Sequence, residues 1–231
     1  HMKSFIENLQ KFLKQFPDYQ DLESVNKIHE KSQVLYLGMD FSRFNAKNIK
    51  KETVPTILWN HRWEYDKNPD FFFKTLQKIK IDGHKFKLVI LGENFHISPS
   101  IFEEAKITFE SEIIHWGYCD SFADYSEWLL KADILPVTSH QEFFGVSVVE
   151  AIYCNIWPIL PQRLSYPELI PKKLQLNHLY INDDDFYIKL RWALKHYKII
   201  RDSRLSAIVS KFDWKSMAQL YDKILQSVQD I

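Results

Sequence analysis

The sequence has few of the residues on which several common kinds of site depend. Its 231 residues include only five glycines and two cysteines. The glycines form neither a G-x-x-x-x-G-K-[ST] loop nor a G-x-G-x-x-G turn, which excludes the usual triphosphate loop and the dinucleotide fingerprint. Cys119 and Cys154 lie in apolar segments, which favours reduced thiols in the core of a cytoplasmic protein over a disulfide framework.

The chain also lacks an excess of either charge and any long apolar run. Thirty Lys and Arg balance thirty Asp and Glu, and both signs are mixed along the chain, so no overall field directs it to nucleic acid or to a membrane. A local basic patch stays possible. No apolar run reaches the roughly 18 residues of a membrane span, and the amphipathic N-terminus is unlike a secretory signal. Because 45% of the residues are apolar, we expect a globular protein with a large core.

Histidine is well represented in the sequence, but its spacing argues against a metal site. The nine histidines include no i,i+4 pair, and none has the Cys/His spacing of zinc sites. No Ser lies in a G-x-S-x-G elbow, so nothing indicates Ser-His-Asp catalysis. We therefore expect no metal.

The order of the apolar runs predicts a parallel α/β sheet. Short runs without polar alternation are each followed by an amphipathic stretch, a pattern typical of a doubly wound, Rossmann-like sheet with helices on both faces. The expected strands are at 33–38, 56–61, 86–92, 111–117, 132–137, 157–161 and 178–181. The expected helices are at 69–81, 99–107, 121–132, 146–154 and 183–199.

The two ends of the chain differ from this repeating part. Helices are predicted at 3–16 and 20–30, and a last helix at 213–228 opens with Asp213 as its cap. A polar stretch without periodicity is the best candidate for a linker. The predicted division is a helical segment at 1–41, a linker at 42–53 and the α/β domain at 54–231.

Two cations follow the second expected strand. Arg62 and Lys67 are five residues apart in a polar loop just before a helix. Ligands of doubly wound sheets bind in the crevice outside the carboxyl ends of the strands, and two cations there suit the charge of a diphosphate. The alternative is a solvated surface pair with no ligand.

Two glutamates, Glu142 and Glu150, have seven residues between them, one of which is Gly145. The helix expected after Gly145 has free N–H groups that can face an anion. Glu150 lies among apolar residues, where an ionised carboxylate needs partners. Sugar hydroxyls are suitable partners, so the two carboxylates could hold a ribose diol and a hexose. The alternative is that Glu142 caps the helix and Glu150 pairs with a cation.

Taken in order, residues 33–228 resemble the C-terminal, donor-binding domain of retaining GT-B glycosyltransferases, in the family 4-like group that includes sucrose synthase and bacterial mannosyltransferases. The stretch "ILWNHRWEYDKNPDFFFKTL" resembles the family's G-R-x4-K element, and "LVILGEN" resembles its glycine-ended strand. Residues 113–155 resemble its long E-x7-E region. The resemblance implies the C-terminal half of a GT-B fold and metal-independent, retaining transfer.

The same resemblance implies a role for each matching residue. Arg62 and Lys67 would hold the donor diphosphate, Glu142 the transferred sugar and Glu150 the ribose hydroxyls. The implied catalytic residues are Arg62, Lys67 and Glu142. The implied nucleotide-sugar-binding residues are these three with Tyr118 and Cys119 beside the base, His140 beside the donor loop, the backbone of Phe143, Phe144, Gly145 and Val146, and Glu150.

A narrower resemblance, to the tRNA-queuosine mannosyltransferase family, is carried by "ILWNHRWEYDKNP", "HQEFFGVSVVEAIYCN" and "LSYPELIP". It implies GDP-mannose as donor and the queuosine base of a tRNA anticodon as acceptor. Two residues depart from the patterns. Gln141 is inserted between His140 and Glu142, and His61 stands where the broader family has glycine.

A GT-B enzyme needs two Rossmann-like domains, and only about 40 residues precede the donor domain here. We therefore expect the chain to bind a nucleotide sugar weakly, without transferring it unless its own N-terminal GT-B domain supplies the acceptor site, for tRNA in the narrower family. No cofactor beyond the donor substrate is expected. The alternatives are a non-catalytic nucleotide- or tRNA-binding module and a sugar-phosphate epimerase of the same architecture. Retention of Arg62, Lys67, Glu142 and Glu150 favours an enzyme domain.

Overall fold

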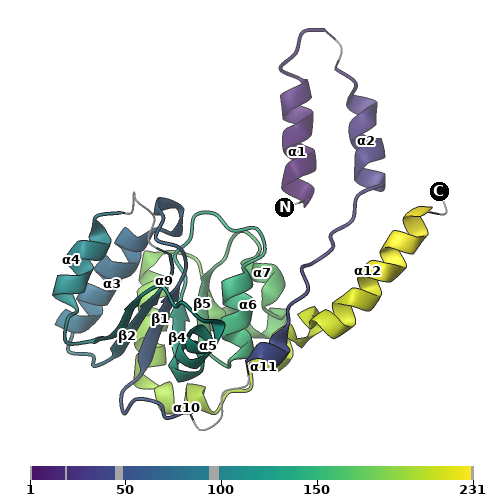
Figure 1. The fold of residues 1–231 in the computed structure, drawn as a ribbon. Helices are drawn as coiled ribbons and strands as arrows, with labels where there is room; N and C mark the ends of the chain where they lie inside the picture. Colours follow the sequence, from purple (N-terminus) through teal and green to yellow (C-terminus); the bar gives the residue numbers. More distant parts are fainter. Residues whose placement is uncertain (1, 19, 45–48, 94–98, 230–231) are drawn as a thin grey trace.

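The computed structural model describes residues 2–18, 20–44, 49–93 and 99–229 and contains one six-stranded parallel sheet (Figure 1). The strand order is β3-β2-β1-β4-β5-β6. The strands are β1 (Thr56–Asn60), β2 (Lys87–Leu91), β3 (Ile113–Gly117), β4 (Ile134–Pro136), β5 (Trp157–Pro161) and β6 (Leu179–Tyr180). The doubly wound sheet expected from the sequence, and its six strands from residue 56 onward, are confirmed.

Helices cover both faces of the sheet because successive side chains of each strand point to opposite faces. In β1, Leu58 belongs to one buried cluster, while Ile57 and Trp59 belong to the other. The first cluster includes residues of α5 (Phe122–Lys131), α6 (Val146–Tyr153), α7 (Tyr166–Leu169) and α11 (Ser206–Val209). The second includes residues of α3 (Pro69–Ile81), α4 (Ile101–Thr108), α9 (Asp183–Lys195) and α10 (Tyr197–Arg201). Both faces of the sheet are therefore apolar and covered by helices. A ligand site is expected at the edges or the ends of the strands instead.

Two expectations about the elements are wrong. The single helix expected at 183–199 is divided into α9 and α10, because His196 (φ −108°, ψ 21°) leaves helical geometry while its ring Nδ1 lies 2.8 Å from the Trp192 carbonyl oxygen. The strand expected at 33–38 is not formed. That apolar run lies outside the sheet, and Met39, just after it, forms an isolated parallel bridge with Asp213.

The segment 33–39 passes beside the beginning of α12 (Trp214–Gln229). The Met39 N–H donates to the Phe212 carbonyl (2.7 Å), and the Trp214 N–H donates to the Met39 carbonyl (2.8 Å). Gly38 is needed here, since a Cβ atom on it would lie 2.1 Å from the Trp214 ring. Asp213 Oδ1 accepts the Lys215 N–H at 2.9 Å, so the predicted cap of the last helix is confirmed.

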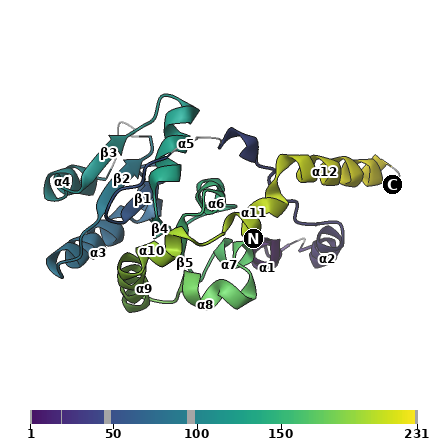
Figure 2. The ribbon, with the colours of Figure 1, turned by 90° about the horizontal axis from the view of Figure 1, so that it is seen from below.

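The helices at the two ends of the chain project from the α/β layers. They are α1 (Met2–Leu13), α2 (Leu22–Glu30) and α12, and Figures 1 and 2 both place them on the side away from α3 and α4. Their large apolar residues are partly exposed, among them Phe5, Phe12 and Trp214. No helix of the described residues is long and apolar enough to cross a membrane.

The segment 42–53, expected as a linker, contacts the α/β layers on both sides of residues 45–48, which lie outside the described residues. Just before it, the Phe41 ring stacks on Tyr153 with centroids 4.1 Å apart, and Phe44 is buried in the same cluster. Beyond the gap, Lys51 Nζ donates to the Ala132 carbonyl at 2.7 Å.

Candidate functional site

The candidate site lies where the direction of strand succession reverses. From β1 the sheet continues to β2 and β3 on one side and to β4, β5 and β6 on the other, and a crevice opens at such a switch point outside the carboxyl ends of the strands. The loops that follow β1 and β4 meet there. The His140 N–H donates to the Asp66 carbonyl at 2.7 Å, and the Thr138 hydroxyl donates to the Lys67 carbonyl at 2.8 Å.

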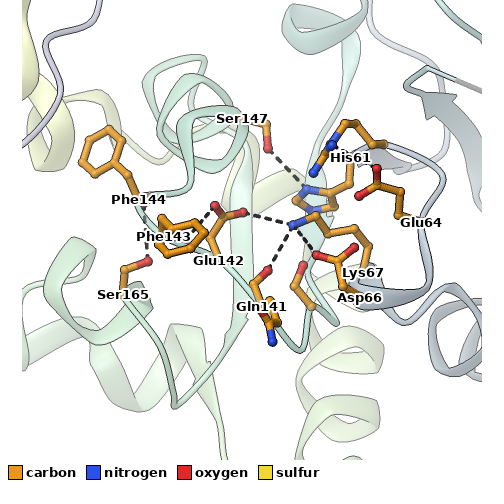
Figure 3. Close-up of polar contacts among 12 residues, drawn as sticks. His61, Glu64, Asp66, Lys67, Gln141, Glu142, Phe143, Phe144, Ser147 and Ser165 are labelled. Carbon is orange, nitrogen blue, oxygen red and sulfur yellow. Dashed lines mark hydrogen bonds and ion pairs between the residues drawn. The ribbon is translucent and has the colours of Figure 1, made fainter. Parts of the chain in front are cut away.

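Lys67 and Glu142 meet between these two loops. The Lys67 side chain is only 10% exposed, and its Nζ lies 3.0 Å from the Gln141 carbonyl, 3.1 Å from Asp66 Oδ2 and 3.7 Å from Glu142 Oε2 (Figure 3). The helix-cap alternative for Glu142 is wrong. Gly145 is the N-cap of α6, no side chain caps it, and Glu142 Oε1 accepts the Phe143 N–H at 3.0 Å.

Arg62 lies apart from that pair, on the wall of a cavity of about 540 Å³. Its half-exposed guanidinium forms an ion pair with Glu64, with Nη1 2.9 Å from Oε1. The same cavity is lined by Tyr118, Cys119 and Glu150, so the structure brings four of the predicted residues together. Lys67 and Glu142 are not among its lining residues. The two predicted cations therefore occupy neighbouring parts of the crevice instead of one cluster.

Glu150 is held in the cavity by Tyr125, whose hydroxyl donates to Glu150 Oε2 at 2.7 Å. Burial raises the pKa of Glu150, while the Tyr125 hydrogen bond and the charge of Arg43 oppose that rise. Burial also raises the pKa of Tyr125 well above its ordinary value, with Glu150 as the next cause. The alternative that Glu150 pairs with a cation therefore holds only in part. The charge of Arg43 acts on the carboxylate, but the direct hydrogen bond comes from the neutral Tyr125 hydroxyl.

Tyr125 and Arg43 line the cavity but were missed from the sequence. Tyr125 lies in a helix whose aromatic residues fit an ordinary core face, and Arg43 lies in the candidate linker. The Arg43 guanidinium is 3.6 Å from the centre of the ring of Phe122, which also lines the cavity, and this contact holds the cation in the cavity wall. The one signal for Tyr125 was a hydroxyl on an apolar helix face, since a buried hydroxyl needs a partner.

His61 links three elements beneath the site. Its carbonyl accepts the Trp59 indole N–H at 2.9 Å, and its ring Nδ1 lies 3.3 Å from Ser147 Oγ in the first turn of α6 (Figure 3). Next to it, Asn60 Nδ2 donates to the Ser147 carbonyl at 2.8 Å. Burial lowers the pKa of His61 to about 3, and the charge of Lys67 adds to that effect. The imidazole is therefore neutral near pH 7.

Gly92 brings the end of β2 against the same residue. Its φ is +128°, and a Cβ atom placed on it would lie 2.1 Å from the His61 carbonyl oxygen. A side chain at residue 92 would thus collide with backbone that cannot yield. His61, which the sequence marked only as a departure from the family pattern, is the point at which β1, β2 and α6 meet.

The other predicted residues do not extend side chains into the cavity. His140 and Val146 are exposed, and Phe143 is 79% exposed. Phe144 packs on Phe212, with ring centroids 5.1 Å apart, and lines a separate apolar groove. The prediction for residues 143–146 concerned their backbone N–H groups, and these lie where α6 begins, after Gly145 at φ +87°.

Metal ligands do not cluster in the part of the chain that the structure describes. No group of three or more His, Cys, Asp or Glu side chains there could hold a metal ion. In the cavity wall, Cys119 Sγ lies 3.7 Å from Nε2 of His115, which does not line the cavity. Burial raises the pKa of the Cys119 thiol, which disfavours the thiolate that metals bind.

Comparison with known sequences gives matches along most of the chain. Residues 40–205 match the family model described as glycosyl transferases group 1, and residues 1–39 match the model described as the N-terminal part of tRNA-queuosine alpha-mannosyltransferase. The tRNA-queuosine alpha-mannosyltransferase of Drosophila melanogaster is 36% identical over an alignment of 179 residues, and the match covers 74% of this chain and 47% of that protein. A probable sucrose-phosphate synthase of Thermosipho melanesiensis is 22% identical over 208 residues, covering 87% of this chain and 48% of that protein. The chain spans about half the length of these relatives.

Solved structures share the fold. A sucrose-phosphate synthase from Thermosynechococcus elongatus matches 84% of this chain and 52% of its own with a TM-score of 0.70 and 14% identity. HepE from Anabaena, solved in complex with UDP, matches 91% of this chain and 62% of its own with a TM-score of 0.69 and 17% identity. These likenesses confirm the GT-B type of α/β fold. The family model, which matches residues 40–205, establishes that this chain belongs to the group 1 glycosyl transferases.

Proposed function

We propose that the chain is the donor-binding domain of a retaining, metal-independent mannosyltransferase that takes mannose from GDP-mannose and attaches it to queuosine in tRNA. The observation that carries the proposal is the gathering of Arg62, Lys67, Glu142 and Glu150 around one crevice at the switch point of the sheet. The choice of sugar and acceptor is supported by the 36% identity to the tRNA-queuosine alpha-mannosyltransferase of Drosophila melanogaster.

The donor would lie across the crevice with its base in the cavity. A volume of about 540 Å³ is within the range of small-molecule sites. Tyr118 and Cys119 would lie beside the base, and Glu150 would accept the ribose hydroxyl groups while Tyr125 holds its second oxygen. Glu142 would accept hydroxyl groups of the sugar.

The diphosphate would lie between Arg62, Lys67 and the beginning of α6. Arg62 would exchange its ion pair with Glu64 for a phosphate oxygen, since an exposed pair of this kind contributes little stability. The N-terminus of α6 is free of side-chain caps and adds a partial positive charge. As the sugar leaves, charge accumulates on the diphosphate, and these groups stabilise it without a general base.

Calorimetry with a panel of GDP- and UDP-sugars tests the donor site. We expect GDP and GDP-mannose to bind the chain, and Arg62→Ala with Lys67→Ala to weaken binding by at least about 100-fold, because two charge-assisted contacts to phosphate are lost. The matched control is Arg191→Ala with Lys195→Ala, which removes the same charges from the exposed face of α9.

The outcomes separate the alternatives. Unchanged GDP binding in the Arg62 and Lys67 double variant would refute the site assignment. Binding of UDP-sugars in preference to GDP-mannose would refute the donor. Nucleotide binding by a whole protein that transfers no sugar would favour the non-catalytic module, and interconversion of nucleotide sugars would favour the epimerase.

A further inference from the structure

His61 and Ser147 form a fixed pair at the base of the crevice that the roles given above leave unused. His61 is 4% exposed, its backbone is held by Trp59 Nε1 and closely covered by Gly92, and it lines the donor cavity. Its ring Nδ1 is 3.3 Å from Ser147 Oγ. Because both ring and backbone are fixed, the imidazole presents its two nitrogens in set directions.

The surroundings of the ring decide which nitrogen carries the proton. Nε2 is buried, and none of the described residues gives it a hydrogen-bond partner. Lys67 and, less strongly, Asp66 are the charges that act on the ring (Figure 3). A lone pair on Nε2 is favoured beside the Lys67 ammonium, whereas an N–H directed toward it is repelled. With the proton on Nδ1, His61 donates to Ser147 Oγ, the hydrogen-bond partner that the described residues give the ring.

This arrangement determines what the Ser147 hydroxyl can do. A hydroxyl group has one proton and accepts up to two hydrogen bonds, so a Ser147 Oγ that accepts from His61 keeps its own proton for another partner. Ser147 lies in the first turn of α6, three residues before Glu150 and hence on the same face of the helix as the residue that lines the cavity. Its carbonyl accepts from Nδ2 of Asn60, a residue that lines the cavity, so the serine backbone is fixed next to the cavity wall.

We propose that Ser147 is a phosphate-binding residue of the donor site, and that His61 is the residue that positions it by occupying its acceptor lone pair. The Ser147 O–H donates to an oxygen of the donor diphosphate beside Lys67 and the N-terminus of α6. This inference rests on the proposed function, because it requires the diphosphate to lie at this end of the crevice. It adds a neutral, oriented donor to the two cations.

Ser147 variants test the contact by calorimetry with GDP and with guanosine, which shares the base and ribose but lacks phosphate. Ser147→Ala should weaken GDP about tenfold, as expected for a hydrogen bond to a charged group, and should leave guanosine unchanged. Ser147→Thr keeps the hydroxyl and should bind GDP within about threefold of the unaltered chain. The control is Ser203→Ala, whose hydroxyl is bonded to the Ile200 carbonyl at the far end of the sheet.

A second measurement tests the orientation without any nucleotide. The ¹⁵N ring spectrum, with His61 assigned through His61→Gln, should show a neutral imidazole protonated on Nδ1 at pH 7. Protonation on Nε2 would overturn the positioning role. Equal loss of GDP and guanosine in Ser147→Ala, or no loss of GDP, would overturn the phosphate contact. If the unaltered chain binds neither ligand, the donor-site proposal itself fails, and the ring spectrum still decides the tautomer.

Discussion

Glu150 shows how much the surroundings of one residue change its chemistry. It belongs to α6, beside the buried Val149 and Ala151, and among the described residues its carboxylate accepts a hydrogen bond from the Tyr125 hydroxyl. The raised pKa means that the folded protein holds the proton of Glu150 more tightly than the unfolded chain does. The proposed contact with ribose would use the ionised form, which the folded protein disfavours, so the carboxylate would be kept at some expense to stability.

The pH dependence of stability tests whether the ionised Glu150 carboxylate destabilises the fold. The contribution of a carboxyl group with a raised pKa is fully present below its unfolded pKa and is lost as pH rises through the folded value. We therefore expect Glu150→Gln to raise Tm by about 2 °C at pH 8 and to leave it unchanged at pH 4, since about 1 kcal/mol shifts Tm by 2–4 °C in a domain of this size. Thermal unfolding at both pH values checks this.

The control for that comparison is Glu127→Gln, because the Glu127 side chain is about half exposed to solvent and pairs with Lys131. Its substitution should move Tm little at either pH. A Glu150→Gln protein that is less stable than the unaltered chain at pH 8 would show that the ionised carboxylate stabilises the fold. Its nucleotide affinity should fall in any case, because an amide is a weaker acceptor for ribose hydroxyl groups.

At the scale of elements, β4 depends on a single buried carboxylate at its start. The Asp133 side chain is fully buried and accepts from the Thr56 N–H at 2.9 Å. Arg201 of α10 contacts it through two nitrogens, at 2.8 and 2.7 Å, and Lys51 contacts it at 3.1 Å. Asp133 is also the main cause of the raised pKa of Arg201. One residue therefore joins β1, β4, α10 and the segment before the sheet.

Removing the Asp133 carboxylate should destabilise the fold at the end of the sheet opposite the candidate site. Asp133→Ala leaves the partly buried Arg201 and the Thr56 N–H without their partner, for which we expect a loss of about 3 kcal/mol in the free energy of unfolding, measured with urea. GDP affinity should persist in the protein that remains folded. The exposed pair of Lys131 and Glu127 provides the comparison, and Glu127→Ala should cost less than about 0.5 kcal/mol. Similar losses in both variants would contradict the bridging role of Asp133.

Elements were predictable where the pattern alone determines them. Apolar runs such as 86–92 and Pro69 at the start of α3 define strands and a helix before any packing is known. The run at 33–38 has the same composition as a strand, but a strand needs a neighbour, and the edges of this sheet are β3 and β6. The break at His196 depends on a side-chain contact that no periodicity records.

The same division holds for the site. Arg62, Lys67, Glu142 and Glu150 were found because charged residues follow strands or interrupt an apolar helix. Whether the two cations would converge was not predictable, since it depends on the partners that each one finds in the folded crevice. These are Glu64 for Arg62, and Asp66 and Glu142 for Lys67. Tyr125, Arg43 and Ser147 carry no pattern of their own, and only the fold brings them to the cavity or its edge.

At the scale of the whole molecule, the chain corresponds to about half of its curated relatives. Partly exposed apolar residues of the end helices, such as Phe5, Phe12 and Trp214, provide the surface that we expect an N-terminal GT-B domain of the whole protein to cover. We propose that the tRNA acceptor binds mainly to that domain. Transfer would then need both halves, although nucleotide binding would need only this one.

A labelling experiment with the whole protein tests that division of roles. The whole protein should transfer radiolabelled mannose from GDP-mannose to tRNA that contains queuosine, and the present chain alone should not. With Arg62→Ala and Lys67→Ala together, transfer should fall at least about 100-fold, as charge stabilisation of the leaving diphosphate is lost. The control acceptor is the same tRNA with guanosine in place of queuosine. Labelling of the control tRNA would refute the acceptor, and labelling by the chain alone would refute the need for a second domain.

The parallel bridge between Met39 and Asp213 has a topological consequence. The chain enters the α/β layers and leaves them at the same point, so the stretch between these two residues is a ring closed by two backbone hydrogen bonds. Closing a ring whose ends already touch needs little further ordering of the chain. The order in which the strands lie in the sheet does not depend on where such a ring is opened. The fold of this unit is therefore defined by the spatial order of its strands, and the ends of the polypeptide could lie in another surface loop.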